Sequence, residues 1–460
     1  MNYVITVDFG STFTKVVVVN LLEKKIELTG KVPSTVGSDA SICLEQCFEL
    51  AKETIGEDEF KHSKKLASSS AAGGLRMSVI GLTESLSMLA GKSAALGAGA
   101  KVINHYNGIL TDEMIQELEN CKTEIILFCG GYEHGNTSMV LQNAEKLARS
   151  SVNVPIIYSG NSDLLPDIRK IMRTYVKKCF TVENIIPSIG VLNTHAVQEV
   201  IRTLFLDQII DMKGFDIVKN EFDNQLVPTP VAVLNAGTLL SKGTKKTKGL
   251  GAVLIVDIGG STTDIYSFNE NKRFEGAKMV GLDEPFGKRT VEGDLGMRES
   301  SIGVIESGDI SHALEHAHVS EEQFRQSIKK RMEDIDYLPT CEKERRIDDA
   351  IARSAVHLAA RRHAGRVEPS FSQNYLQIQF GKNISEISKV IGTGGILVHN
   401  QNAAKIMKEA EKLQEEKGVL LPNRIEPYLD TNYVLFSSGL LREVDEEAAM
   451  EIMLTSIQKC

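Results

Sequence analysis

The sequence predicts an α/β protein made of two similar domains, with a doubly wound α/β domain inserted into the first. A strand–turn–strand pattern occurs twice, at Val7–Lys15 and again about half a chain later at Val256–Asp264. Between residues 77 and 187, short apolar runs alternate with amphipathic stretches, which is typical of a parallel sheet covered by helices. These two observations define the expected domain plan.

The composition is that of an ordinary soluble protein, with 42% hydrophobic and 25% charged residues in a chain of 460. This length is sufficient for two or three domains with full cores. The formal net charge of −9, without any basic cluster, argues against binding to nucleic acid or to an anionic membrane. We therefore expect neither partner.

The N-terminus enters an apolar strand directly, without the basic segment and cleavage site of a secretory signal. No apolar run approaches the roughly 20 residues that a membrane span requires. The seven cysteines are scattered and include no C-x-x-C pair. We expect a cytoplasmic protein with reduced cysteines.

The first domain is expected at residues 1–76 and 188–248, interrupted by the insert at 77–187. Periodicity predicts strands at 3–9, 12–20, 25–32 and 66–70, with helices at 39–55, 194–210 and 231–241. In the insert it predicts strands at 77–81, 101–104, 124–129, 154–158 and 179–181, with helices at 83–96, 111–120, 137–150 and 165–175.

The second domain is expected at residues 249–432, followed by a C-terminal hinge helix at 433–460. A buried strand at 252–256 leads into the second turn. Beyond it we expect helical segments at about 309–336, 342–364 and 402–412, and strands at 375–380 and 389–392. The polar segment Glu292–Arg298 has the glycine spacing of a turn.

Each repeated turn combines an acid, glycines that let backbone N–H groups approach a ligand, and hydroxyls. The residues are Asp8, Gly10, Ser11 and Thr12, with Lys15, and Asp257, Gly259, Gly260, Ser261 and Thr262. One such turn would be explained by turn preferences alone. Two copies indicate two domains that each offer a hairpin to one polyphosphate. A third glycine-rich turn, at Gly392, Gly394 and Gly395, follows a strand and suits an anion or a ribose.

These three patterns, in this order, resemble the actin-like ATPase superfamily of sugar and acetate kinases, heat-shock chaperone ATPases and actin. The resemblance implies two actin-like (ribonuclease H-like) domains around a nucleotide cleft, with ATP and Mg²⁺ as cofactors. The alternating pattern of the insert resembles flavodoxin-like domains, although the loop Leu82–Ser85 lacks the histidine of the cobalamin-binding members. A generic α/β insert is the alternative.

Four strings together resemble the glutamate mutase reactivating-factor family, MutL or GlmL: Ser68–Leu75, Asp257–Asp264, Glu292–Arg298 and Gly392–Gly395. This implies an ATPase that acts as a reactivating chaperone for an adenosylcobalamin-dependent amino-acid mutase, promoting exchange of damaged cobalamin. The alternatives are a small-molecule kinase, a hydantoinase-type ATP-dependent hydrolase and a non-catalytic actin-like scaffold.

The superfamily resemblance also implies roles for individual residues. Asp8 and Asp257 would hold hydrated Mg²⁺ and, with Thr262, form the catalytic set. Gly10, Ser11, Thr12, Lys15, Gly259, Gly260, Ser261 and Thr262 would bind phosphates, and Gly392, Gly394 and Gly395 would lie near adenosine. Thr229 stands where chaperone ATPases carry a water-positioning acid. We therefore expect slow ATP hydrolysis.

Overall fold

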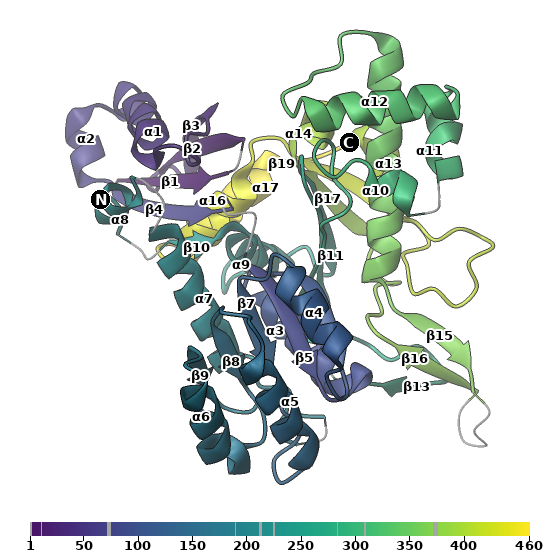
Figure 1. Ribbon diagram of the computed structural model, residues 1–460. Coiled ribbons are helices and arrows are strands. Elements are labelled where there is room, and N and C mark those ends of the chain that lie inside the picture. Colours follow the sequence, from purple (N-terminus) through teal and green to yellow (C-terminus); the bar gives the residue numbers. More distant parts are fainter. Residues whose placement is uncertain are drawn as a thin grey trace. The chain divides into compact units, whose positions relative to one another are not determined.

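A computed structural model of the protein describes residues 2–10, 12–70, 75–188, 190–210, 214–223, 226–282, 284–307, 310–370 and 376–460. The chain divides into two compact units (Figure 1). Unit 1 comprises Met1–Asn20, Glu27–Ala232 and Gly281–Asp283, and unit 2 comprises Leu21–Ile26, Val233–Val280 and Glu284–Cys460.

Unit 1 begins with a mixed five-stranded sheet. Its strand order is β10-β4-β1-β2-β3, with bounds Val227–Pro228, Lys64–Ser69, Tyr3–Phe9, Phe13–Asn20 and Lys25–Pro33. The central strand β1 runs antiparallel to β2 and parallel to β4. Its alternate residues Ile5, Val7 and Phe9 are fully buried in a core shared with Cys43 and Cys47 of helix α1 (Ala40–Ile55). These two cysteines therefore act as small core residues.

The second sheet of unit 1 is entirely parallel. Its order is β6-β5-β7-β8-β9, with bounds Lys101–Asn107, Arg76–Gly81, Ile125–Phe128, Ile156–Tyr158 and Cys179–Thr181. Numbered from its own first strand, this is 2-1-3-4-5, the order of flavodoxin-like doubly wound sheets. The alternation of strands and helices in the sequence predicted a parallel sheet here, and the pairing agrees with that prediction.

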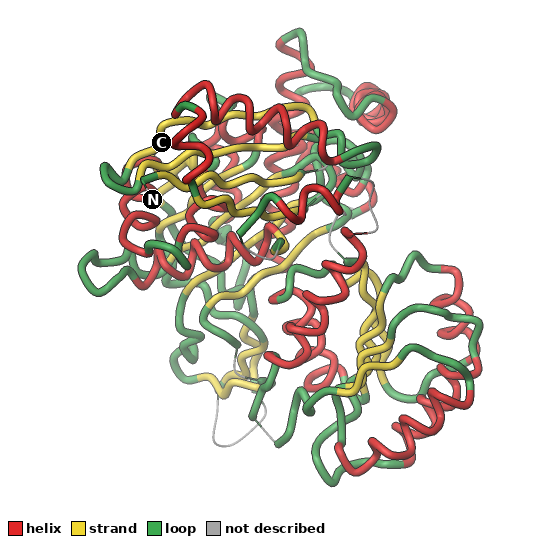
Figure 2. The backbone as a smooth tube through the Cα atoms, turned by 90° about the vertical axis from the view of Figure 1, so that its left-hand side faces the viewer, coloured by secondary structure: helices red, strands yellow, loops and turns green. Residues whose placement is uncertain are grey.

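Both faces of this parallel sheet are covered by helices (Figure 2). Ile125 and Leu127 belong to the core that includes helices α3 and α7, whereas Ile126 and Phe128 belong to a separate core with α4, α5 and α6. The helices span Leu89–Gly97, His195–Ile210, Asp112–Asn120, Ser138–Arg149 and Leu165–Thr174. Because successive strand residues point to opposite faces, a strand buried on both sides is continuously apolar.

Unit 2 contains a mixed sheet with the same arrangement as the first. Its order is β14-β12-β11-β17-β18-β19, with bounds Gly287–Glu292, Thr263–Phe268, Val253–Ile258, Lys389–Thr393, Glu426–Asp430 and Ile457–Lys459. Strand β11 is antiparallel to β12 and parallel to β17. Numbered within each unit, both mixed sheets read 3-2-1-4-5, and β19 is an added edge strand.

A small sheet of unit 2 has the order β13-β16-β15, with bounds Ala277–Val280, Gln377–Phe380 and Arg366–Pro369. Strand β16 accounts for most of the strand expected at 375–380, whose first residue, Tyr375, lies outside the described residues. Residues 433–460 hold helices α16 (Val434–Leu441) and α17 (Glu446–Ser456) and strand β19, so the expectation of one hinge helix was too simple.

The helical segment expected at about 309–336 is not one continuous helix. The structure has α11 (Ile310–Ala317) and α12 (Glu321–Glu333), separated by a break. His318 has φ 52°, which a right-handed helix cannot accommodate. Ser320 then starts α12 with a capping box, because its hydroxyl accepts from the Gln323 N–H and the Gln323 side chain accepts from the Ser320 N–H.

Helix α13 (Glu342–His363) forms the centre of the unit 2 core and agrees with the helix expected at 342–364.

The remaining elements are α2 (Glu57–His62), a π-helical turn Glu84–Met88, a 3₁₀ turn Ser162–Leu164, α8 (Phe215–Asn220), α9 (Thr229–Lys242), α10 (Gly303–Glu306), α14 (Gly395–Val398), α15 (Ala403–Met407) and the 3₁₀ turn η3 (Lys408–Ala410). Among the described helices, none is both long and apolar enough to cross a membrane.

Candidate functional site

The hairpin of unit 1 turns between β1 and β2. The Gly10 N–H donates to the Phe13 carbonyl at 3.2 Å, which closes a tight turn. Ser11 lies outside the described residues, and Thr12 is exposed. A side chain at Gly10 would place its Cβ 2.5 Å from the Phe13 carbonyl oxygen, so the turn itself requires glycine there.

Asp8 lies at the carboxyl end of β1 and is almost completely buried. Its Oδ1 accepts hydrogen bonds from the Ser68 hydroxyl on β4, at 2.9 Å, and from the Thr229 hydroxyl at the start of α9. Two hydroxyl donors from separate elements therefore fix the orientation of this carboxylate. Thr229, which stands where an acid was expected, serves as a support for Asp8.

Lys15 is the register partner of Asp8 across the antiparallel pair of β1 and β2. Directly opposite residues in such a pair project from the same face of the sheet. The first hairpin therefore presents a carboxylate and an ammonium group side by side, at the base of a turn with a hydroxyl at its tip. This is a set of groups that suits a hydrated divalent cation together with an anion.

The hairpin of unit 2 has the same geometry, with the Gly259 N–H donating to the Thr262 carbonyl at 2.8 Å. Asp257 is opposite Asp264 in the register, as Asp8 is opposite Lys15. The charge at the second position is reversed, and Asp264 is neutralised by Arg289 of β14, whose Nη2 lies 2.6 Å from Asp264 Oδ1. The Thr262 hydroxyl donates to Asp264 Oδ2 at 3.2 Å.

The segment Glu292–Arg298 supports the second hairpin from one side. The backbone N–H groups of Met297 and Arg298 donate to the carbonyls of Gly259 and Gly260 at 3.0 and 2.8 Å. A Cβ at Gly296 would lie 2.5 Å from the Gly260 carbonyl oxygen, so only glycine permits this approach. Sequence analysis identified this segment as a turn and as part of the family resemblance, but not as a support for the hairpin, because the residues that it contacts lie more than thirty positions away.

Buried charges anchor this supporting segment. Arg298 Nη2 lies 3.2 Å from Asp348 Oδ2 on α13, and Arg331 Nε of α12 donates to the other oxygen of Asp348 at 2.7 Å. The Arg331 side chain is fully buried and also pairs with Glu344 at 2.8 Å. Each of these charges has partners, which is the condition for tolerating them inside a protein. The network ties the hairpin support to two helices.

Glu292, at the start of the supporting segment, is held by Arg362, whose Nη1 donates to it at 2.8 Å. The same guanidinium nitrogen donates to Asp294 at 2.8 Å. Burial raises the pKa of Glu292 above its usual value, although the hydrogen bond from Arg362 acts in the opposite direction. Arg362, Arg298 and Arg289 thus brace the hairpin region, a role that nothing in their local sequence revealed.

The glycine-rich turn after β17 lies directly against the second hairpin. Gly394 has φ 94°, and a Cβ there would lie 2.3 Å from the carbonyl oxygen of Ile258, the last residue of β11. Thr393 is the register partner of Asp257 across the parallel strands. The structure therefore brings two sequence patterns, separated by more than a hundred residues, to one edge of the unit 2 sheet.

The predicted ligand-binding glycines fall into two groups. Gly10, Gly392 and Gly394 are required by the fold, and at Gly392 a Cβ would meet Met407 Sδ at 2.7 Å. At Gly259 the nearest atom to a Cβ would be 3.4 Å away, at Gly260 it would be 4.0 Å away, and at Gly395 nothing lies within 4 Å. None of the last three has positive φ. Because the described chain gives no reason for glycine there, these positions are where a ligand could approach the backbone.

Tyr433 was missed by sequence reasoning. It precedes α16 in a left-handed conformation with φ 53°, and Asp430, three residues earlier, accepts from the Val434 N–H at 2.9 Å and so caps this helix. Burial raises the pKa of Tyr433 to about 12, with the charges of Asp257 and Asp430 adding to the shift. The phenol therefore stays protonated at neutral pH, and its oxygen lies 3.4 Å from His399 Nε2.

Comparison with known proteins gives a match to the family model described as MutL protein over residues 4–457. Protein MutL of Clostridium tetanomorphum is 37% identical over 455 residues, which cover 98% of each chain. Solved structures similar to this chain include a xylulose kinase from Bifidobacterium adolescentis (10% identity, 98% of this chain and 93% of that one, TM-score 0.33). Another is an acetate kinase from Porphyromonas gingivalis (11% identity, 97% and 100%, TM-score 0.28). The chain belongs to the MutL protein family.

Proposed function

We propose that this protein is an ATP-dependent chaperone that reactivates an adenosylcobalamin-dependent amino-acid mutase of the glutamate mutase type, by promoting the exchange of damaged cobalamin. One observation carries the ATP-dependent part: two sheets of identical strand order each present an aspartate-bearing hairpin at the same position. Membership of the MutL family supports the mutase as the client.

The residues around the two hairpins fit ATP with Mg²⁺. Asp8 and Asp257 would hold the hydrated cation, which supplies neutralising charge to the phosphates. Lys15 would add a second positive charge in unit 1. The open positions Gly259 and Gly260 offer backbone N–H groups to phosphate oxygens, and the open position Gly395 offers space for adenosine, with Gly394 beside it. Gly392 would act indirectly, through packing beneath the turn.

Hydrolysis is proposed to be slow. The Thr229 hydroxyl is engaged by Asp8 and, unlike a carboxylate, cannot accept a proton from water at neutral pH. Such an enzyme would spend most of its cycle with nucleotide bound. A long-lived ATP state suits a chaperone, because binding energy can be used to favour an open conformation of the client before the nucleotide is consumed.

The test uses the purified protein with ATP and Mg²⁺, with and without a mutase that carries damaged cobalamin. We expect slow phosphate release that rises when the mutase is added, together with release of cobalamin. Asp257→Ala should abolish both, whereas Asp336→Ala, which removes an exposed carboxylate elsewhere in unit 2, should change neither. If phosphate release does not respond to the mutase, and no cobalamin is released, the chaperone function is wrong.

The same experiment separates the alternative functions. Transfer of phosphate to a small molecule, detected as ADP formation without free phosphate, would indicate a kinase. ATP-dependent ring opening of a hydantoin would indicate the hydrolase. ATP binding without turnover, accompanied by self-assembly, would indicate a scaffold. Retention of full ATP binding by Asp257→Ala would refute the assignment of the second hairpin.

A further inference from the structure

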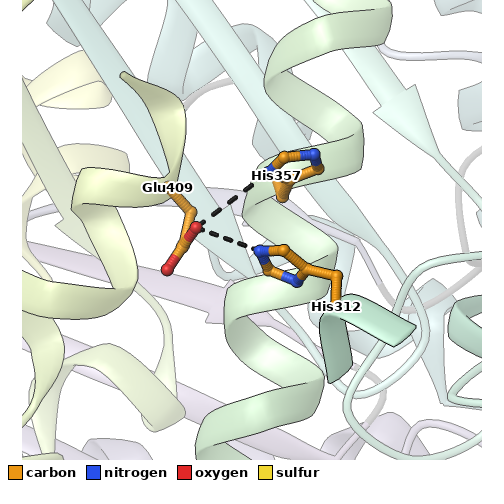
Figure 3. A group of neighbouring side chains, drawn as sticks. All are labelled: His312, His357 and Glu409. Carbon is orange, nitrogen blue, oxygen red and sulfur yellow. Dashed lines mark hydrogen bonds and ion pairs between the residues drawn. The ribbon is translucent and has the colours of Figure 1, made fainter. Parts of the chain in front are cut away.

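A cluster of histidines and a glutamate lies in unit 2, among residues that the hairpins do not use. His312 comes from α11, His357 from the middle of α13, and Glu409 from the 3₁₀ turn η3 (Figure 3). One potential ligand atom from each residue lies within 4.8 Å of the other two. Figure 3 shows the three side chains converging from separate elements.

The distances match those around a small metal ion. His312 Nε2 lies 3.2 Å from Glu409 Oε2, and His357 Nδ1 lies 4.0 Å from the same oxygen. Two ligands at about 2.1 Å from a tetrahedral metal are separated by roughly 3.4 Å. The observed separations lie on either side of this value, so small side-chain movements would allow all three atoms to reach one ion.

Neighbouring residues orient the ligands in the manner of outer-shell partners. The Ser354 hydroxyl lies 3.1 Å from His312 Nδ1, which leaves Nε2 directed at Glu409. Arg353 Nη1 donates to Glu409 Oε1 at 2.8 Å and so leaves Oε2 to face the imidazoles. Arg361 donates to the main-chain carbonyls of both His357 and Glu409, which holds their segments together.

We propose that His312, His357 and Glu409 bind a divalent transition-metal ion such as Zn²⁺, which joins α11, α13 and η3. Two imidazoles and one carboxylate are a common ligand set for this class of ion and leave a fourth position for water. His316 flanks the site, with its Nε2 3.6 Å from Glu409 Oε1. Helix α13 also carries Asp348, which anchors the hairpin support.

The competing explanation is that a protonated His312 and Arg353 alone neutralise Glu409. Two variants distinguish the explanations, His312→Ala and Glu409→Gln, with His62→Ala as the control, since His62 is exposed and lies in unit 1. The full-length protein is stripped with a chelator, its cysteines are alkylated, and Zn²⁺ is titrated against a chromogenic chelator. We expect one tight site in the wild type and the control, and affinity at least about 100-fold weaker in the two variants.

Two measurements on the wild type do not depend on the folding of any variant. Zn²⁺ should raise its Tm and a chelator should reverse the shift, because an ion that binds only the folded state stabilises it. Co²⁺ in place of Zn²⁺ should give visible absorption of nitrogen and oxygen ligation without a thiolate band. The proposal is overturned if the wild type takes up no Zn²⁺, if His312→Ala binds as tightly as the wild type, or if His312→Ala lowers stability equally with and without the ion.

Discussion

The two hairpins are built on the same plan but carry different charges. In both, an aspartate is the last but one residue of the central strand, a tight turn follows, and a hydroxyl residue lies opposite the aspartate on the neighbouring parallel strand, Ser68 in unit 1 and Thr393 in unit 2. Opposite the aspartate on the antiparallel strand stands Lys15 in one hairpin and Asp264 in the other. The difference shows that the same backbone arrangement is compatible with two different distributions of charge.

The two hairpins rely on different neighbouring residues to accommodate their charges. In the first hairpin Lys15 stands opposite Asp8, and the hydroxyls of Ser68 and Thr229 donate to the Asp8 carboxylate. The second hairpin contains two carboxylates and requires Arg289 from a third strand. We infer that Lys15 in the first hairpin is available to a ligand, whereas Arg289 beside the second hairpin stabilises the protein by pairing with Asp264.

The largest expected effect on stability comes from removing the positive charge of Arg289. Arg289→Met leaves Asp264 buried without its partner, so we expect a loss of about 3–5 kcal/mol in the free energy of unfolding. Lys15→Met, the counterpart in the first hairpin, should change stability by less than about 1 kcal/mol and weaken ATP binding. Urea unfolding and nucleotide titration measure the two effects. The double variant Arg289→Met/Asp264→Asn should recover most of the loss, and equal destabilisation by both single variants would contradict the comparison.

An intermediate effect is expected at the equivalent glycines. Gly10→Ala places a Cβ 2.5 Å from a backbone oxygen and should destabilise unit 1 by about 1–3 kcal/mol. Gly259→Ala meets its nearest atom at an ordinary 3.4 Å, so the fold should tolerate it, but the added methyl group should obstruct phosphate and raise the Kd for ATP about tenfold. Thermal unfolding with and without ATP separates the effects. Unchanged ATP affinity in Gly259→Ala would argue against a phosphate at this turn.

The smallest effect on stability is expected from replacing one threonine in each hairpin, and it should be equal in the two. Thr14 and Thr263 occupy matching positions, and both hydroxyls are buried without a hydrogen-bond partner among the described residues. Replacing a buried, unpaired hydroxyl by a methyl group of the same shape removes a desolvation cost, so Thr14→Val and Thr263→Val should each leave stability unchanged or raise it by up to about 1 kcal/mol. Calorimetry of each variant is the measurement. A clear loss in either would mean that its hydroxyl has a role in the folded state.

Much of the architecture was accessible from the sequence because it depends on local patterns. The apolar runs that became β1, β5, β7 and β11 could be located, since a strand buried on both faces is continuously hydrophobic. The break between α11 and α12 was missed, since it depends on a left-handed conformation at His318 and a cap at Ser320. Neither interrupts the amphipathic pattern strongly enough to be recognised.

The sequence by itself determined the repeated aspartate and glycine turns, the alternating pattern of the insert and the family. Tertiary structure decided what supports them. Glu292–Arg298 beneath the second hairpin, Thr229 against Asp8, and the convergence of His312, His357 and Glu409 all join residues far apart in the chain. Such contacts leave no periodic signal, because hydrogen bonds and ion pairs between distant segments depend on how the elements pack, whereas strands and turns depend on neighbouring residues.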